Sequence, residues 1–333
     1  MMEFSSSVMH KTSACLVGSL ALVCFVIWAL GDVAKRQSLY LPTRVQVYGD
    51  SLFLTLPKYR SDSPKQSFSL GQATQSGLTA FPNKAAHKSG LIANAVDLQL
   101  DSRGTLWVLD SGVVDTLRTP RKTGNASILA LDADSGKINQ IINLGDLVPG
   151  RAQYLSIEET KSGTRFLYVS DGPSRSIAVW DVKANKGHRV LLPERTMPKI
   201  RPKVLYTSLV GSRLYFTYFG GSELFYIETS GLRKGGIVKI VGRKDPRMVF
   251  LGSAGYEIIF RLAGEKEVLS WDTRNPLDGE HISVLDLGDA KKNAMAAVPN
   301  YGYVWVLETD VKSFLKGKQP EHSFRALNAT KGN

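Results

Sequence analysis

A short element recurs six times along the chain and constrains its fold more than any other feature. Each copy is a glycine in a polar turn, followed within five residues by an apolar run of strand-forming side chains. Successive glycines lie 44 to 59 residues apart, and a period of about 40–50 residues is typical of propeller blades built from four strands. The copies are Gly49 with Leu52–Leu54, Gly104 with Leu106–Val108, Gly163 with Leu167–Val169, Gly211 with Leu214–Phe216, Gly255 with Ile258–Phe260 and Gly302 with Val304–Val306.

The second copy, residues 101–112, shows how the element is built. Asp101 can bond its own backbone and Gly104 tolerates a positive φ, so the sequence predicts a tight turn. The continuous apolar run Leu106–Leu109 is typical of a strand buried on both faces. Four copies are followed by an alternating strand that ends in an acid: Ile128–Asp132, Ile177–Asp181, Leu224–Glu228 and Val268–Asp272.

This constant order predicts an all-β fold, a six-bladed β-propeller of four-stranded antiparallel blades. An open seam in such a ring would leave unpaired strand edges. We therefore expect the chain ends, Arg44–Tyr48 and Ser323–Leu327, to meet in one sheet.

The N-terminal segment predicts export from the cell. Residues 14–30 form an almost uninterrupted apolar run, slightly short for a membrane span of about 20 residues and slightly long for a signal core. Small residues before and at Gly31 suit signal peptidase, so we assign residues 1–31 to a signal peptide and 32–333 to a single propeller domain. An uncleaved membrane anchor is the alternative, because basic residues follow directly.

The remaining chain features agree with a secreted glycoprotein. Both cysteines, Cys15 and Cys24, lie in the signal segment, so the mature chain has no disulfide framework. Sequons at Asn125 and Asn328 predict N-glycosylation. Residues 61–95, rich in polar and small residues, read as an irregular connection.

Charge and motifs exclude several function classes. The net charge is +12, but the basic residues are scattered and no nucleic-acid motif occurs, so we expect no nucleic-acid partner. Such a surface favours acidic polymers of an extracellular matrix or membrane phosphates, and the alternative is a basic surface that is simply solvated. The sequence contains no Gly-rich phosphate loop, GxSxG elbow or HExxH motif, and we assign no cofactor, metal or catalytic residue.

Strand direction predicts a site at one face of the ring. In antiparallel blades, the residue that closes the second strand lies on the same face as the residue that opens the first strand. The closing positions are Leu56, Asp110, Asp171, Tyr218, Leu262 and Glu308, and the opening positions include Asn94, Gln153, Tyr206, Arg247 and Asn293.

From these positions we predict a ligand-binding channel mouth made by Asp110, Asp171, Tyr218, Glu308 and Asn94. Three acids and an aromatic ring suit a cation such as an amine. The alternative is that the acids cap turns by accepting hydrogen bonds from backbone N–H groups.

The ordered motifs of the mature chain resemble the insect yellow/major royal jelly protein family. They are Phe81–Asn83, Asp101–Gly112, Phe166–Asp171, Leu214–Phe216, Thr229–Arg233, Val241–Lys244, Ser270–Pro276, Val304–Leu307 and Phe324–Leu327. The resemblance implies a secreted six-bladed propeller, often glycosylated, with roles in cuticle pigmentation, egg covering, nutrition or ligand capture. The chain departs from the family in lacking its usual cysteines; Ser102 or Arg103 stands where one is expected.

Two functions follow. The first is a non-enzymatic component of a cuticle- or eggshell-like extracellular matrix that binds small biogenic amines or catechols, with no membrane contact after signal cleavage. The alternative is an enzyme, either a dopachrome-converting isomerase or a metal-dependent lactonase. Convergence of the carboxylates of Asp110, Asp171 and Glu308 on one point would favour the lactonase.

Overall fold

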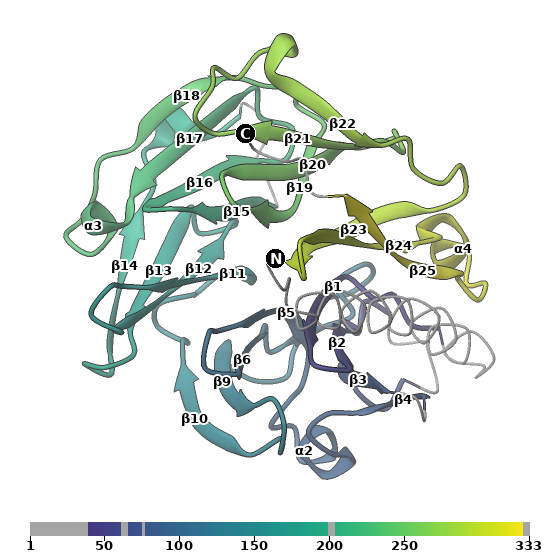
Figure 1. Ribbon diagram of the computed structural model, residues 1–333. Helices are drawn as coiled ribbons and strands as arrows, with labels where there is room; N and C mark the ends of the chain where they lie inside the picture. The colour runs from purple at the N-terminus through teal and green to yellow at the C-terminus, as the bar shows by residue number, and fades with distance from the viewer. Residues whose placement is uncertain (1–38, 61–65, 75–76, 199–203, 329–333) are drawn as a thin grey trace, which may run out of the picture.

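Six antiparallel sheets surround a central axis in the computed structural model, which describes residues 39–60, 66–74, 77–198 and 204–328 (Figure 1). Five sheets have four strands, and the sixth has three in the described part of the chain. The prediction of an all-β, six-bladed propeller is confirmed. The inner strands β1, β5, β11, β15, β19 and β23 face the axis.

Each blade is contiguous in sequence. Blade 1 contains β1 (Arg44–Tyr48), β2 (Ser51–Thr55), β3 (Leu70–Thr74) and β4 (Gly77–Ala80). Blade 2 contains β5 (Ala95–Leu100), β6 (Thr105–Asp110), β9 (Ser127–Asp132) and β10 (Ile138–Asn143), with the small hairpin β7 (Val113–Val114) and β8 (Arg121–Lys122) inserted after β6. Blade 3 contains β11 (Ala152–Glu159), β12 (Arg165–Asp171), β13 (Ser176–Asp181) and β14 (Lys186–Leu191).

The second half of the ring follows the same order. Blade 4 contains β15 (Leu205–Val210), β16 (Arg213–Tyr218), β17 (Glu223–Glu228) and β18 (Lys239–Arg243). Blade 5 contains β19 (Met248–Ala254), β20 (Glu257–Leu262), β21 (Val268–Asp272) and β22 (Ile282–Asp286). Blade 6 contains β23 (Asn293–Asn300), β24 (Tyr303–Thr309) and β25 (His322–Asn328).

Helices are short and lie in the connections. They are α2 (Lys84–Lys88), α3 (Thr229–Leu232), α4 (Val311–Leu315) and the 3-10 turns Glu194–Thr196 and Gly279–His281. No helix in these described ranges is long and apolar enough to cross a membrane. The predicted signal peptide, residues 1–31, lies outside the described residues.

The recurring glycine turn has the predicted chemistry. Gly104 has a φ of 76°, and Asp101 Oδ1 accepts hydrogen bonds from the backbone N–H groups of Arg103 and Thr105, both at 2.9 Å. Its other oxygen accepts from Trp107 Nε1 at 2.8 Å and pairs with Arg165 Nε at 2.8 Å. This one buried carboxylate therefore fixes the turn, orients the strand that follows it and ties blade 2 to blade 3.

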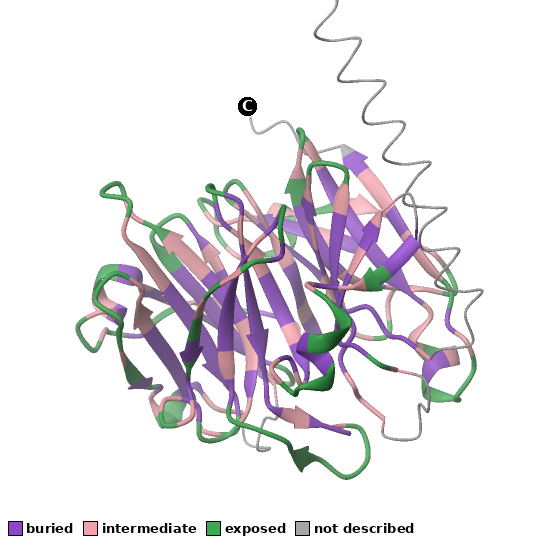
Figure 2. Ribbon diagram, turned by 90° about the horizontal axis from the view of Figure 1, so that it is seen from below, coloured by how far each residue is buried: buried purple, intermediate pink, exposed green. Residues whose placement is uncertain are grey.

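Hydrophobic packing between neighbouring blades forms the core. Six clusters of buried apolar side chains occur, and each joins residues from two adjacent blades. Buried residues accordingly fill the middle of the strands, while exposed residues gather in the connecting loops (Figure 2). The second strands are buried on both faces because they pack against a neighbouring blade on each side.

The seam between blades 1 and 6 differs from the predicted closure. Arg44–Tyr48 is the inner strand of blade 1 and pairs with β2, while β25 pairs with β24, so in the described ranges the chain ends do not share a sheet. A two-residue turn containing Gly49, whose φ is 54°, commits Arg44–Tyr48 to a local hairpin. Side-chain packing closes the ring instead, with Val45, Val47, Val298 and Trp305 in one cluster.

The interpretation of residues 61–95 as an irregular connection is wrong. The stretch contains β3, β4 and α2, the first two being the outer strands of blade 1. Outer strands face solvent on one side and carry polar side chains such as Gln72, Thr74 and Thr79. Their composition therefore resembles that of a loop.

Candidate functional site

The predicted face exists, because each closing residue lies opposite the start of an inner strand. Asp110 pairs with Ala95, Asp171 with Ala152 and Glu308 with Ala294. At this end of the channel lies a cavity of about 520 Å³, and its lining includes residues near the start of all six inner strands. We call this cavity the funnel.

Polar and aromatic side chains dominate the funnel lining. Of the strand-opening residues named from the sequence, Asn94, Gln153 and Tyr206 line it, whereas Arg247 and Asn293 do not. Of the five predicted site residues, only Asn94 belongs to the lining. The other lining side chains with polar groups are Thr43, Arg44, Tyr59, Ser111, Thr116, Arg151, Tyr154 and Arg261.

Asp110 and Asn94 hold the loops that form one funnel wall. Asp110 accepts hydrogen bonds from the N–H groups of Gly112 at 2.7 Å and Asn94 at 2.8 Å. The Asn94 side chain in turn accepts from the Lys58 N–H at 2.7 Å and donates to the Val113 carbonyl at 2.5 Å. Burial raises the pKa of Asp110, and the hydrogen bonds from the N–H groups of Gly112 and Asn94 oppose that shift.

Asp171 has the same role in blade 3. Fully buried, it accepts hydrogen bonds from Gly150 N–H at 2.8 Å, Arg151 N–H at 2.9 Å and Ser174 N–H at 3.1 Å. A Cβ atom at residue 150 would collide with this carboxylate, so glycine is required there. Asp171 thus folds the chain entering the inner strand back onto the end of the second strand.

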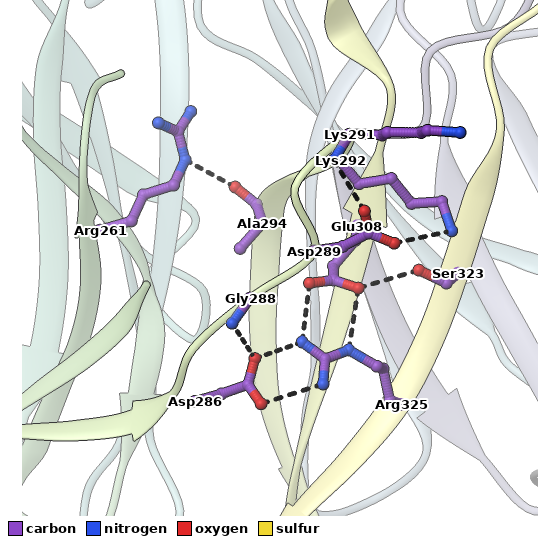
Figure 3. A network of polar contacts seen from close by, with 10 residues as sticks. All are labelled: Arg261, Asp286, Gly288, Asp289, Lys291, Lys292, Ala294, Glu308, Ser323 and Arg325. Carbon is purple, nitrogen blue, oxygen red and sulfur yellow. Dashed lines mark hydrogen bonds and ion pairs between the residues drawn. The ribbon is translucent and has the colours of Figure 1, made fainter. Parts of the chain in front are cut away.

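Glu308 belongs to an ion-pair network between blades 5 and 6 (Figure 3). Arg325 donates from Nε and Nη2 to the two Glu308 oxygens, both at 2.8 Å, and its guanidinium also binds Asp286. Ser323 donates a third hydrogen bond to Glu308 at 2.9 Å. The network connects β22 to β25 at the outside of the ring.

Tyr218 is buried in the packing between blades 3 and 4 and belongs to the same hydrophobic cluster as Tyr168 and Phe216. Burial raises the pKa of Tyr218 to about 12. Like the three acids, Tyr218 does not line the funnel.

The three acids are engaged with protein groups rather than gathered around a ligand position. In the described ranges, no group of three or more His, Cys, Asp or Glu side chains could hold a metal ion. The geometry of Asp110 and Asp171 matches the alternative in which the acids cap turns. The convergence that would favour the metal-dependent lactonase is not found among these residues.

Five charged or aromatic residues of the funnel lining were not predicted as site residues from the sequence: Arg44, Arg151, Arg261, Tyr59 and Tyr154. The rings of Tyr154 and Tyr206 lie 5.2 Å apart, and the guanidinium of Arg44 lies 4.9 Å from the Tyr154 ring centre. Burial is the largest cause that raises the pKa values of Tyr59, Tyr154 and Tyr206. These three side chains are consequently neutral phenols at physiological pH.

Below the funnel, a second cavity of about 160 Å³ follows the channel axis. Arg44 and Tyr154 line both cavities, and Asp97 lines only the inner one. Asp97 accepts hydrogen bonds from Leu155 N–H at 2.7 Å and Leu98 N–H at 2.8 Å and lies 3.5 Å from Arg44 Nε. Burial raises the pKa of Asp97 to about 6 despite the neighbouring Arg44.

A shift of one residue explains why Arg261 was missed, whereas Arg151 lies in the loop before its strand. Arg151 directly precedes β11, and Arg261 directly precedes Leu262, which had been assigned as a closing position. Neighbouring side chains on a strand point to opposite faces, so one position changes a packing residue into a cavity residue. An arginine beside a strand end in several repeats was the available signal.

The two predicted glycosylation sites lie in different kinds of structure, one in a loop and one at the end of a strand. Asn125 is exposed in the loop between β8 and β9, a position where a glycan can be accommodated. Asn328 is the last residue of β25. Glycosylation at either position stays a prediction.

A six-bladed β-propeller with a polar, aromatic funnel at one end of its channel is the class of protein that the fold and the site define. Residues 93–209 match the model of the family described as "Major royal jelly protein". This match confirms the resemblance seen in the motifs and extends from the start of blade 2 into β15 of blade 4. No curated protein matches the sequence.

Similarity to solved structures concerns the fold alone, and only the first of the two structures below reaches a TM-score of 0.50. A chain of a nidogen/laminin complex has a TM-score of 0.50 and 12% identity, with 82% of this chain and 98% of that chain covered. A periplasmic gluconolactonase from Pseudomonas aeruginosa has a TM-score of 0.47 and 14% identity, with 86% and 88% covered. At these identities, neither structure indicates what the present chain binds or does.

Proposed function

We propose that this protein is a secreted propeller of the yellow type that binds a small aromatic molecule in its funnel and acts without catalysis, in an extracellular matrix such as cuticle or eggshell. The funnel itself is the observation that carries the binding role. Its volume of about 520 Å³ lies in the range of about 300–1,000 Å³ usual for small-molecule sites. The match to the major royal jelly protein family and the apolar N-terminal segment support the secreted part of the proposal.

The funnel is suited to a flat ring with polar substituents. Tyr154 and Tyr206 provide aromatic surface, and their neutral hydroxyl groups, with that of Tyr59, provide hydrogen-bond donors. A catechol combines a ring that packs on such a surface with two hydroxyl groups that pair with such donors. The proposal therefore keeps catechols as ligands.

The test measures binding of an uncharged catechol, 4-(2-hydroxyethyl)catechol, to the full secreted chain by titration calorimetry. We expect saturable binding that weakens about tenfold in Tyr154→Ala, since an aromatic contact contributes on the order of 1 kcal/mol beyond its buried area. Tyr226→Ala is the matched control. Tyr226 also packs partly buried beneath an arginine, with Arg213 4.7 Å from its ring centre, but it lies outside the funnel.

Two results would contradict the proposal. One is absence of measurable heat for the catechol at millimolar concentration with correctly folded protein. The other is equal loss of affinity in the Tyr154 and Tyr226 variants. The matrix role is tested separately, by asking whether the protein is recovered in the insoluble extracellular fraction of the tissue that expresses it.

A further inference from the structure

The funnel lining is positively charged. Three arginines, Arg44, Arg151 and Arg261, contribute side chains, and the described lining includes no aspartate or glutamate. The nearby carboxylate of Asp97 lies below the funnel, 3.5 Å from Arg44. Arg44 is thus paired, whereas Arg261 adds a positive charge that no carboxylate of the described lining balances.

Among the described residues, Arg261 lacks a carboxylate partner such as the one that Arg44 has in Asp97. Its Nε donates to the Ala294 carbonyl at 2.8 Å, and its two Nη atoms point away from the Glu308–Arg325 network (Figure 3). Across the described chain, no carboxylate lies within ion-pair distance of it. Burial lowers the pKa of Arg261, and Arg44 lowers it further. A partly buried cation is costly to leave without a counter-ion, so this arginine is placed for an anionic group.

The neighbouring phenols strengthen the same preference. Tyr59, Tyr154 and Tyr206 remain protonated, and the hydroxyl groups of Tyr154 and Tyr206 hydrogen-bond to each other, so this pair keeps one O–H donor for an oxyanion beside that of Tyr59. A guanidinium with two free Nη atoms can bind both oxygens of a carboxylate. An ammonium ion would instead be repelled by the Arg261 guanidinium and would find no carboxylate in the described lining to bind.

We propose that the funnel selects small aromatic molecules that carry a carboxylate, with Arg261 binding the carboxylate and Tyr154 and Tyr206 contacting the ring. The inference rests on the proposed binding function and names its ligand class. It also replaces the cation that the acids Asp110, Asp171 and Glu308 had suggested. The charge of the lining, rather than its shape, sets this preference.

Three catechols that differ mainly in side-chain charge test the inference at pH 7. They are 3,4-dihydroxyphenylacetate, which is an anion, 4-(2-hydroxyethyl)catechol, which is neutral, and dopamine, which is a cation. We expect the anion to bind at least tenfold more tightly than dopamine, with the neutral compound between them. The preference should shrink as salt concentration rises, because the interaction is partly screened.

Arg261→Gln should weaken binding of the anion about tenfold and change binding of the neutral catechol less than twofold. Arg261→Lys should restore part of the loss, because it keeps the charge without the guanidinium geometry. Arg247→Gln is the matched control. It removes the same charge from the same blade at an exposed position outside the funnel, where Arg247 pairs with Asp245 and Glu265.

The outcomes separate the two proposals. If none of the three catechols binds, the proposed function fails and this inference falls with it. If the neutral catechol binds but dopamine binds as tightly as the anion, only the charge inference is overturned. Unchanged anion affinity in a correctly folded Arg261→Gln also overturns the role of that residue. Should Arg261→Gln lower the melting temperature, the comparison of the three catechols on the unaltered protein decides instead.

Discussion

Acids and arginines lie at the same end of this propeller but serve different purposes. Asp110, Asp171 and Glu308 end second strands and are bound by backbone N–H groups or by Arg325. Arg151 and Arg261, at neighbouring positions, line the funnel. In this ring, the acids at equivalent strand ends share a structural task, and arginines that only some blades carry line the funnel.

The largest expected effect tests the structural role of the acids. Asp171→Ala leaves the N–H groups of Gly150, Arg151 and Ser174 without their acceptor, so we expect a loss of about 3 kcal/mol in the free energy of unfolding. Asp171→Asn keeps one acceptor oxygen and should lose less. Urea unfolding measures both. A variant as stable as the original would mean that the carboxylate is free for a ligand.

A smaller loss is expected for Glu308→Gln, because Arg325 keeps Asp286 as a partner. Removing one buried carboxylate from this network should lower the free energy of unfolding by about 2 kcal/mol. The control is Glu228→Gln, which breaks the more exposed pair with Arg213 and should cost below about 1 kcal/mol. Similar losses in the two variants would show that the blade 5–6 network has no special role.

The smallest expected effect is a pH dependence of ligand affinity, which tests the proposed role of the charged groups in and below the funnel. Arg44, Tyr59 and Tyr154 face Asp97, whose pKa burial raises to about 6. As pH falls through 6, Asp97 takes up a proton and the floor of the funnel loses its negative charge. Affinity for 3,4-dihydroxyphenylacetate should then rise about two- to threefold between pH 7.5 and 5, since a carboxyl group of ordinary pKa stays ionised.

Titration calorimetry at several pH values measures this change, and Asp97→Asn should remove it. Dopamine affinity should change in the opposite direction or not at all. A fall in affinity for the anion between pH 7.5 and 5 would contradict the position of Asp97 as the controlling charge.

The sequence predicted the ring but only one wall of its funnel. The glycine turns and the apolar second strands are local features, so the six blades and the face on which Asp110 and Asp171 lie could be inferred directly. The charged lining depends on which side chain of each neighbouring pair points to the axis. At Arg261 a difference of one residue decides that, and Arg151 lies in a loop just before β11.

Two further features lay beyond sequence reasoning for physical reasons. The outer strands β3 and β4 have polar, solvent-facing residues and therefore resembled a loop. The seam between blades 1 and 6 depends on packing between residues about 250 positions apart, such as Arg44 and Met295, whose contact is the 2.5 Å hydrogen bond from Arg44 Nη1 to the Met295 carbonyl. No local pattern encodes such a contact.

That seam has a mechanical consequence. The polypeptide chain itself connects all the remaining pairs of neighbouring blades. Blades 1 and 6 are joined, in the described ranges, by side-chain packing and the Arg44 hydrogen bond. Tension applied between residues 39 and 328 would load this boundary first and separate two apolar surfaces before it extended any sheet. Under load, the ring would open into a curved strip of six intact blades, and it could close again when the tension was released.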